Sequence, residues 1–448
     1  MTNSMGLLLV ALSHCIGWAV RGNWGHENGA MIPGALSALA LVACSGRANW
    51  MRRAAWFGFF GALGWSFGGS MSYGIVIGYT KSGVGATVAY GLAMLFVIGF
   101  LWGAVGGAAV AMTASFEDRR LRDFFPPLIV VFCVWAVWEW LEMGGPNWFD
   151  SDWVGVGLLL LSVSGHCLWK RSVSDAARLM LRMGVGWFAG MLVLVQVMGL
   201  HMTPPRSDNW AGSVGMAAAM LAWFWRRGEL EIVRVSLITA LFSGAGFALG
   251  DLFQVLGPST GITTNWWSLM EQSFGFIAGA GLWIAMRPLM GAERREEEGM
   301  DWSHGFAVWF LLVVMTYVNI RKNVTTAWLK NQVMPEAWWG LSADAWFHVA
   351  YFLLALTVTA LVVRHWRSAL AVVPASWLGR TQALYVVVLW WIVLGNLSRV
   401  LPFPPARMVT EGFVLVYACV CTVGVLWVSE SRPVPGAGAS CRGGPVGR

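Results

Sequence analysis

The chain has few charged residues: Asp, Glu, Lys and Arg together make up 12% of its 448 positions. Soluble domains carry about twice that fraction. Apolar side chains supply 57% of the residues, and the mean hydropathy is +0.61. A water-soluble core has no room for so much apolar surface, so the scarcity of charge excludes an ordinary soluble domain.

Several catalytic motifs are missing as well. The sequence has no P-loop, no dinucleotide-binding glycine pattern, no G-x-S-x-G nucleophile turn and no H-E-x-x-H helix. Its seven cysteines lie mostly in apolar runs without metal-ligand spacing, which is typical of buried thiols. ATP-driven transport by this chain alone and ordinary Ser-His-Asp hydrolysis are therefore not expected. No cofactor and no metal ion are predicted.

Long apolar runs recur instead, and they predict an all-α polytopic membrane protein. An apolar stretch of about 20 residues is needed to cross the hydrocarbon layer as a helix. We predict one integral membrane domain over 1–428, followed by a disordered, Gly- and Pro-rich tail over 429–448. The fourteen predicted spans are 5–20, 30–45, 54–73, 86–112, 125–142, 153–169, 179–199, 210–225, 234–256, 265–286, 303–320, 344–363, 382–400 and 408–428.

The basic residues predict how these spans are oriented. Alternate loops and the C-terminal tail hold 22 of the 30 Lys and Arg residues, which leaves 8 for the opposite side. Short loops rich in Lys and Arg stay cytoplasmic. Both termini are therefore expected in the cytoplasm, with the chain in a bacterial cytoplasmic membrane. The net charge of +7 is then a topology signal, and no nucleic-acid partner is predicted.

Gly-aromatic patterns suggest an internal repeat. "IGWAVRG" in the first span matches "VGWFAGM" in the seventh, and "LGWSFGG" in the third matches "AGFALGD" in the ninth. A single shift of six spans relates them, which predicts parallel halves over 1–170 and 171–363 with extra helices over 364–428. The alternative is that short glycine and aromatic patterns match by chance.

Two family resemblances follow from these features. In outline, fourteen spans with a six-helix repeat resemble the major facilitator superfamily. The loop "SGRANWMRR" lacks the aspartate and the second glycine of that family's motif, so no residue role is transferred. The stretch "LGRTQALYVVVLW" (378–390) is similar to a late helix of multipass membrane acyltransferases, but their arginine-bearing N-terminal motif is missing here.

The most polar stretch on the predicted outer face is "CIGWAVRGNWGHENGA" (15–30). His14 and Arg21 are seven residues apart and so share one face of a helix. Ionisable groups at membrane depth tend to face a partner or a wet cavity. We predict a solute-binding corner here; the alternative is an interfacial loop from which Arg21 reaches the headgroups. The other candidates in this corner are Asn23, Trp24, His26 and Glu27.

Carboxylates in two other spans complete the predicted site. Glu139 lies one helical turn before Glu142, and two neighbouring carboxylates raise each other's pKa. Glu271 falls inside the predicted tenth span, with Gln272 beside it and Asp251 before the preceding loop. We predict Glu271 and Glu139 as proton-carrying groups and Asp251 as an accessory carboxylate. The alternative for Glu139 is a pairing with a nearby arginine.

The dipeptide Asn-Trp recurs in the predicted outer segments, at 23–24 and at Asn265–Trp266 among others. Indole rings stack on sugar rings, and asparagine amides both donate and accept hydrogen bonds. This pattern favours a carbohydrate-like solute. With 30 tryptophans in the chain, an interfacial aromatic belt is the alternative.

Together these features predict a secondary active transporter that couples a small polar solute (a sugar, polyol or sugar acid) to protons. The expected partners are that solute and the lipid bilayer. The alternative is a membrane-embedded acyl- or glycosyltransferase that acts on a glycan or lipid-linked substrate at the outer face. In that case His14 or His26 is the predicted general base, Glu27 orients it, and Arg21 holds an anionic group.

Overall fold

The computed structural model of the chain describes residues 3–24, 28–67, 73–141, 152–204, 208–291, 301–320, 328–329, 335–364, 380–400 and 405–430. Each of the fourteen predicted apolar spans overlaps a helix or a continuous helical run in these ranges, and the part of the third span at 68–72 lies outside them. The long helices are α1 (Asn3–Trp24), α2 (Met31–Ser45), α4 (Ala54–Phe67), α6 (Gly85–Ser115), α8 (Phe125–Trp140), α9 (Trp153–Lys170), α10 (Asp175–Gly190), α11 (Asn209–Arg226), α12 (Leu230–Leu256), α13 (Trp266–Met290), α17 (Ala343–Arg364), α18 (Arg380–Val400) and α19 (Pro405–Glu430).

Short elements connect or extend these helices. Two wider, π-helical stretches prolong α10 and α14, and the described strands form one small antiparallel hairpin. The short elements are η1 (Asn28–Ala30), α3 (Ala48–Arg52), α5 (Gly74–Thr80), α7 (Asp118–Arg122), η2 (Met191–Val197), η3 (Gly257–Thr260), α14 (Trp302–Trp309), η4 (Phe310–Val314), α15 (Met315–Ile320), β1 (Ala337–Trp338) and β2 (Leu341–Ser342).

The length and composition of the helices are those of a membrane protein. Nine helical stretches within the described ranges are long and apolar enough to cross a bilayer. Three further apolar helices, Met31–Ser45, Trp302–Val318 and Thr381–Leu397, are shorter. The all-α fold and its multi-pass, membrane-integral character are therefore confirmed in coarse terms, whereas fourteen crossings are not.

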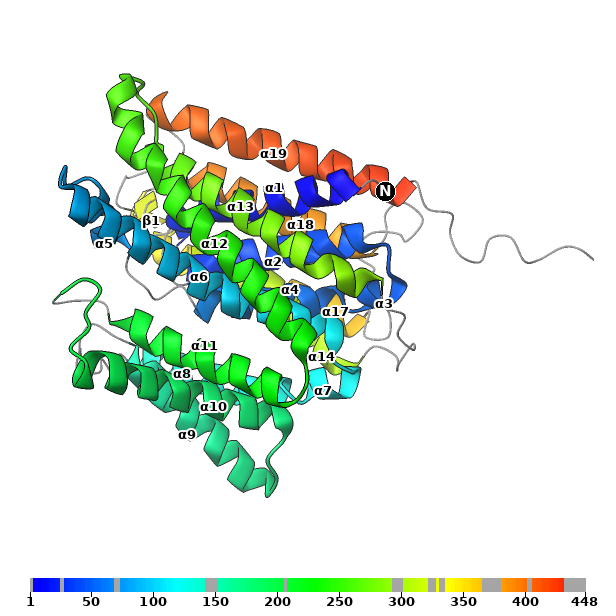
Figure 1. Cartoon of the computed structure of the whole chain (residues 1–448). Helices are drawn as coiled ribbons and strands as arrows, with labels where there is room; N and C mark the ends of the chain where they lie inside the picture. The colour runs from blue at the N-terminus through cyan, green and yellow to red at the C-terminus, as the bar shows by residue number, and fades with distance from the viewer. Residues whose placement is uncertain are drawn as a thin grey trace, which may run out of the picture.

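The bundle has a central group of helices and a peripheral one. α1, α2, α4, α6, α12 and α13 pack together at the centre, and α18 and α19 cover α1 and α2 (Figure 1). α8, α9, α10 and α11 form the peripheral group (Figure 1). α1 begins and α19 ends on the side of the bundle where α3 and α7 lie, which we call the terminal end; α5 and the hairpin lie at the opposite side, the α5 end (Figure 1).

Small residues bring the central helices into close contact. Gly99, Gly103 and Gly107 of α6 form a G-x-x-x-G-x-x-x-G series against α12. A Cβ on Gly103 would lie 2.6 Å from the carbonyl oxygen of Thr239, a distance that no side chain tolerates. Such small-residue series let helix backbones approach closely in membranes, where packing rather than the hydrophobic effect drives association. This signal was readable in the sequence and was missed there.

The packing does not confirm the six-helix repeat. Under the predicted shift, α6 corresponds to α13 and α12 to α4. A repeat would therefore place α13 along α4 in the way that α6 lies along α12. Among the described elements α6 lies along α12, but α4 packs on α2 and α6 rather than along α13. The Gly-aromatic patterns lie at close helix contacts instead: Gly17 meets Pro33, and Gly64 meets the backbone of α6. Close packing alone is therefore sufficient to explain the patterns.

Candidate functional site

Arg21 lies near the end of α1, at the α5 end of the bundle, and its side chain is 0% exposed. Gly29 of η1 packs on it so closely that a Cβ at that position would lie 2.9 Å from Arg21 Cγ. The helix continues to Trp24, which places Arg21 inside α1 and not in a loop. A guanidinium withdrawn from water needs partners, because an isolated buried charge is very costly.

Tyr73 and Glu271 are two such partners, and they come from two other segments. The Arg21 guanidinium donates a hydrogen bond to the Tyr73 hydroxyl, which in turn donates to Glu271 Oε1 at 2.7 Å. Arg21 Nη1 also lies 3.6 Å from the same carboxylate oxygen, and the Glu271 side chain is 3% exposed. The three residues, which we call the Arg–Tyr–Glu triad, join α1, α13 and the residue before α5 in one buried ion pair with a hydroxyl bridge.

Aromatic rings surround the guanidinium of the triad. Arg21 Cζ lies 5.0 Å from the ring centroid of Trp18, 5.1 Å from that of Tyr73 and 5.2 Å from that of Trp102. Cation–π attraction of this kind strengthens when water is excluded. Trp267 stacks on the outer side of Tyr73 with centroids 5.6 Å apart, and it is 36% exposed. The triad therefore lies one aromatic layer beneath the surface.

His14 lies deeper, and both of its ring nitrogens have partners. The Trp18 indole N–H donates to His14 Nε2 at 2.9 Å, so Nε2 is the unprotonated nitrogen. Nδ1 therefore carries the proton and points to the Pro33 carbonyl at 3.1 Å and the Ser37 hydroxyl at 3.0 Å. We assign this tautomer from the hydrogen-bond network. Because Nε2 already accepts from Trp18, His14 has no ring nitrogen left to act as a base in this state.

The sequence correctly grouped His14 with Arg21, although the connection between them is indirect. Trp18 lies between the two residues: it donates to His14 and its ring faces Arg21. Gly279 of α13 leaves no space beyond His14, since a Cβ there would lie 2.7 Å from the His14 Cβ. The shared helical face was therefore predicted correctly, whereas the intervening tryptophan was not identified.

Asp251 is a second fully buried carboxylate at the α5 end. Neither of its oxygens has a hydrogen-bond partner of good geometry among the described residues, although the Thr80 hydroxyl and the Lys81 ammonium lie close enough to interact with the carboxylate. The neighbouring Thr80 hydroxyl donates to the Ile77 carbonyl, and the Lys81 ammonium donates to Gln254 at 2.6 Å. Asp251 and Glu271 thus differ: Glu271 pairs with a cation within the bundle, whereas no ion pair of Asp251 is formed with the described residues.

The remaining residues predicted for α13 have visible structural contacts. The Asn265 side chain caps α13 by accepting from the Ser268 backbone N–H at 3.2 Å, and Trp266 packs on Gly257. Gln272 donates to the Ser268 hydroxyl at 3.1 Å and to the Thr410 carbonyl of α19 at 3.4 Å. Their predicted contact with a solute stays a prediction.

The structure does not bring Glu139 to the triad. Glu139 is exposed on α8, which packs chiefly on α9 in the peripheral group of helices. Asn23 and Trp24 belong to the last turn of α1, but their side chains are not among those described. His26, Glu27 and Glu142 lie outside the described residues.

Two of the buried polar groups that sequence reasoning missed stand out. Tyr73, one of only seven tyrosines, bridges the triad, but it is the last residue of the predicted third span, 54–73, and nothing in its spacing marked it. Glu411 accepts a hydrogen bond from Asn396 at 2.6 Å between α19 and α18, and it is 6% exposed. A lone acid inside an apolar span is a recognisable signal, so Glu411 was detectable by the rule that selected Glu271.

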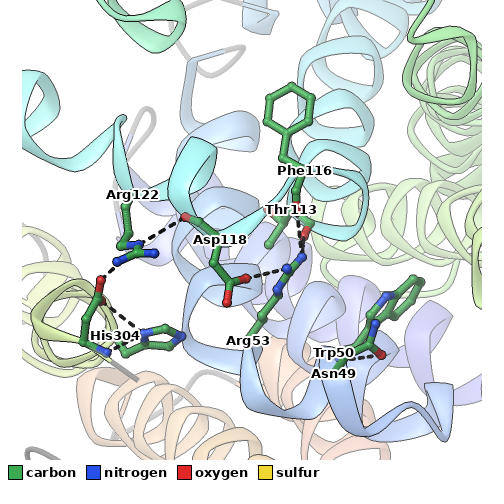
Figure 2. Close-up of polar contacts among 9 residues, drawn as sticks. Asn49, Trp50, Arg53, Thr113, Phe116, Asp118, Arg122 and His304 are labelled. Atoms are coloured by element: carbon green, nitrogen blue, oxygen red, sulfur yellow. Dashed lines mark hydrogen bonds and ion pairs between the residues drawn. The ribbon is translucent and has the colours of Figure 1, made fainter. Parts of the chain in front are cut away.

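A second ionic cluster lies at the terminal end (Figure 2). Arg53 forms an ion pair with Asp118 and donates to the carbonyls of Thr113 at 3.3 Å and Phe116 at 2.8 Å, at the end of α6. Arg122 Nε lies 3.2 Å from Asp301, the residue that caps α14. These contacts connect the start of α4 with the end of α6, with α7 and with α14. We call them the terminal-end cluster.

Asp301 has a strongly perturbed carboxyl. Burial raises its pKa, but hydrogen bonds from His304 and Ser303 outweigh this and lower the pKa to about 2. The His304 ring stacks on Trp56 with centroids 4.0 Å apart, which holds it beside Asp301. The carboxylate is therefore ionised throughout the physiological range.

The donor sets of the described residues can be compared with those of metal sites. No three His, Cys, Asp or Glu side chains in the described ranges come close enough together to hold a metal ion. The triad offers a guanidinium, a phenol and a carboxylate, a set suited to hydrogen bonding and proton exchange.

Comparisons with known proteins add no assignment: no family model, curated protein or solved structure matches the chain.

Proposed function

We propose that the chain is a proton-coupled secondary active transporter of a small polar organic solute, such as a sugar, polyol or sugar acid. The Arg–Tyr–Glu triad is its solute and proton site. In this proposal the fourteen helical runs all cross the bacterial cytoplasmic membrane, with both termini in the cytoplasm.

The burial of the triad among apolar helices is the observation that supports this proposal. A charged side chain at membrane depth is costly, and where it occurs it marks a solute or proton pathway by default. Arg21 and Glu271 lie on helices α1 and α13, which pack along each other, and Tyr73 lies on a separate segment. Small movements among three segments would therefore open or close the site, as alternating access requires.

Uptake into proteoliposomes tests the proposal. The purified full chain, reconstituted with an inwardly directed proton gradient, is expected to accumulate at least one member of a panel of labelled sugars, polyols and sugar acids. Glu271→Gln is expected to abolish gradient-driven accumulation, because the amide cannot exchange a proton. Glu231→Gln is the matched control, since Glu231 is exposed in the first turn of α12. Failure of the wild type to accumulate any member would contradict the proposal.

The alternative, a transferase working at the outer face, is favoured by the position of the triad close to one surface of the bundle. Under this alternative Arg21 holds an anionic group of the acceptor. His14 is a poor candidate for the base, because Nε2 accepts from Trp18. Turnover of a glycan or lipid-linked substrate by the purified chain, without any solute accumulation, would favour the enzyme.

A further inference from the structure

We propose that Asp251 is a second proton-binding site, separate from the triad. Its carboxyl carries a proton while the Lys81 ammonium is bound to Gln254, and it releases that proton when the ammonium moves onto the carboxylate. The inference goes beyond the proposed function, because it concerns Asp251 and its neighbours alone and needs no solute.

Burial of the Asp251 carboxyl without an ion pair is the observation that leads to this inference. Asp251 is 0% exposed, and neither of its oxygens has a hydrogen-bond partner of good geometry among the described residues. An ionised carboxylate in such a place is far more costly than a neutral carboxyl, so a buried acid without a cation takes up a proton instead. The carboxyl of Asp251 is therefore expected to be neutral in this arrangement.

The neighbouring Thr80 hydroxyl is arranged for a protonated carboxyl. It donates its only proton to the Ile77 carbonyl at 2.8 Å, so it offers Asp251 an oxygen lone pair and no hydrogen. A neutral carboxyl can donate to that oxygen, whereas a carboxylate cannot. Gly91 of α6 packs closely on Thr80, since a Cβ at this glycine would lie 2.6 Å from Thr80 Cγ2. Thr80 is thus held beside Asp251.

Lys81 is a cation that can compensate the carboxylate after the proton leaves. Its exposed ammonium donates to Gln254 Oε1 at 2.6 Å and is close enough to act on Asp251. Gln254 lies three residues after Asp251 and so shares its face of α12. The backbone N–H of Lys81 is bound to the Gly78 carbonyl at 3.2 Å, in a turn. The flexible side chain alone can therefore move the ammonium between Gln254 and Asp251.

The exchange of proton and ammonium balances the charge at the buried carboxyl. In the first state a neutral acid lies near an ammonium that is exposed to water. When the proton passes to the solution, the carboxylate gains one negative charge, and the Lys81 ammonium moves onto it to form a neutral ion pair. Gln254 then loses a hydrogen bond, which costs less than an unpaired buried charge because the amide is neutral. Uptake of a proton reverses these steps.

Lys81 is the charged group that acts on the Asp251 carboxylate from the elements packed against α12. The other titratable groups on α12 and on those elements either have partners of their own or lie at distant helix ends. The first kind are Glu271 with Arg21, Asp208 with His201, and Tyr79 with Tyr90; the second kind are Arg226, Glu231, Arg234 and Arg287.

Infrared spectroscopy of the full chain in detergent tests the inference, because a protonated carboxyl has a carbonyl stretch that an ionised carboxylate lacks. The wild type is compared with Asp251→Asn, and Asp123→Asn is the matched control, since Asp123 is exposed at the end of α7. We expect a protonated-carboxyl band near neutral pH that is lost in Asp251→Asn and kept in the control. Equal bands in the wild type and Asp251→Asn would overturn the inference.

Lys81→Met tests the part played by the lysine. Without the ammonium the carboxylate has no compensating cation, so the band should persist to a pH about one to three units higher than in the wild type. Lys170→Met is the control, because Lys170 is exposed at the end of α9, and it should leave the titration of the band unchanged. A titration that Lys81→Met does not move would refute the exchange of proton and ammonium.

A further measurement covers the case in which Asp251→Asn does not fold. Isotopic labelling of the aspartate carboxyls in the wild type and in Lys81→Met separates their bands from those of glutamate. A protonated aspartate band that responds to Lys81→Met is expected, and it must come from the carboxyl on which Lys81 acts. The absence of any such band would overturn the inference.

The infrared measurement also separates this inference from the transport proposal, because it needs neither a solute nor a gradient. A proton on Asp251, without accumulation of any solute in proteoliposomes, would uphold the inference and refute the transporter. Accumulation of a solute by a chain in which Asp251 is ionised would uphold the transporter and refute the second proton site.

Discussion

The two ends of the bundle hold ion pairs of different kinds. At the α5 end, the side chains of Arg21 and Glu271 are 0% and 3% exposed, whereas at the terminal end those of Arg122 and Asp301 are 29% and 21% exposed. Water screens the second pair and is excluded from the first. The contact between Arg122 and Asp301 can therefore be exchanged for water at small cost, whereas a change at the triad must be compensated within the protein. The Arg53–Asp118 pair, with side chains 12% and 11% exposed, is intermediate between them.

The two groups of ion pairs also differ in what their described contacts connect. The terminal-end cluster joins several helix ends, and its members also cap helices: Arg53 binds the last carbonyls of α6, and Asp301 caps α14. The described contacts of the triad join side chains of three different segments. Under the proposed function, the cost of burying its two charges is the cost of a binding site.

Arg21→Ala is expected to have the largest effect on stability. It leaves the Glu271 carboxylate buried without its cation, which should lower the free energy of unfolding by about 3–5 kcal/mol. Thermal or denaturant unfolding in detergent measures it. The double variant Arg21→Met with Glu271→Leu removes both charges and should recover most of the loss. If Arg21→Ala were as stable as the wild type, the pair would not be desolvated as described.

Tyr73→Phe should have the next largest effect. The phenylalanine keeps the ring stacked on Trp267 but removes the hydroxyl between Arg21 and Glu271, and hydrogen bonds to charged groups contribute about 1.5–3 kcal/mol. Tyr79→Phe is the matched control, because Tyr79 packs on Tyr90 near the surface. An equal loss in both variants would indicate a general effect of the substitution and not a role in the triad.

Arg53→Ala compares the terminal-end cluster with the triad. It removes the ion pair with Asp118 and the hydrogen bonds to the carbonyls of Thr113 in α6 and of Phe116 just after it, and the expected loss of stability is about 1–3 kcal/mol. Gradient-driven uptake per folded molecule should be unchanged. A loss of uptake without a loss of stability would contradict a purely structural role for the cluster.

Asp301→Ala should be milder and dependent on pH. The variant loses the cap of α14, which contributes about 1 kcal/mol. The pKa of Asp301 is lowered from 3.8 to about 2, so its ionised form stabilises the fold above pH 3.8 and this contribution is lost as the pH falls toward 2. The difference in stability between wild type and variant should therefore shrink over that window. A difference that stays constant on acidification would contradict the pairing with Arg122 and His304.

Arg178→Ala is expected to have the smallest effect on stability of these substitutions. Arg178 and Asp175 form a pair at 3.2 Å with side chains 53% and 30% exposed. Exposed pairs contribute about 0.2–1 kcal/mol and are screened by salt. Unfolding measured at low and high salt should show a small effect that disappears as salt is added. A loss comparable to that of Arg21→Ala would remove the contrast between the buried and exposed ion pairs.

Sequence reasoning succeeded where a local property determines the structure. Helix-length apolar runs predicted the position of each long helix, because any helix in lipid must satisfy its own backbone and present apolar side chains. The pairing of His14 with Arg21 on one face followed from helical period alone. Glu271 was selected because an acid within an apolar run is rare.

The same reasoning had less success with contacts between distant segments. Tyr73 reaches Glu271 across 198 positions of sequence, and no local pattern indicates that distance. Glu139 resembles Glu271 in its apolar surroundings along the chain, yet it is exposed on α8 while Glu271 is buried in α13. The neighbours of a helix decide whether its polar side chain is enclosed, and one sequence does not name those neighbours.

The amino-acid sequence by itself determined that this is an all-α protein with apolar helices of membrane-crossing length, and it placed the helix boundaries within a few residues. Both depend on hydropathy and helical period, which are local. Only the tertiary structure decided that Arg21 meets Tyr73 and Glu271 in the buried interior of the bundle. That meeting depends on close packing of small residues between helices, and such packing is a property of surfaces in contact and not of any single segment.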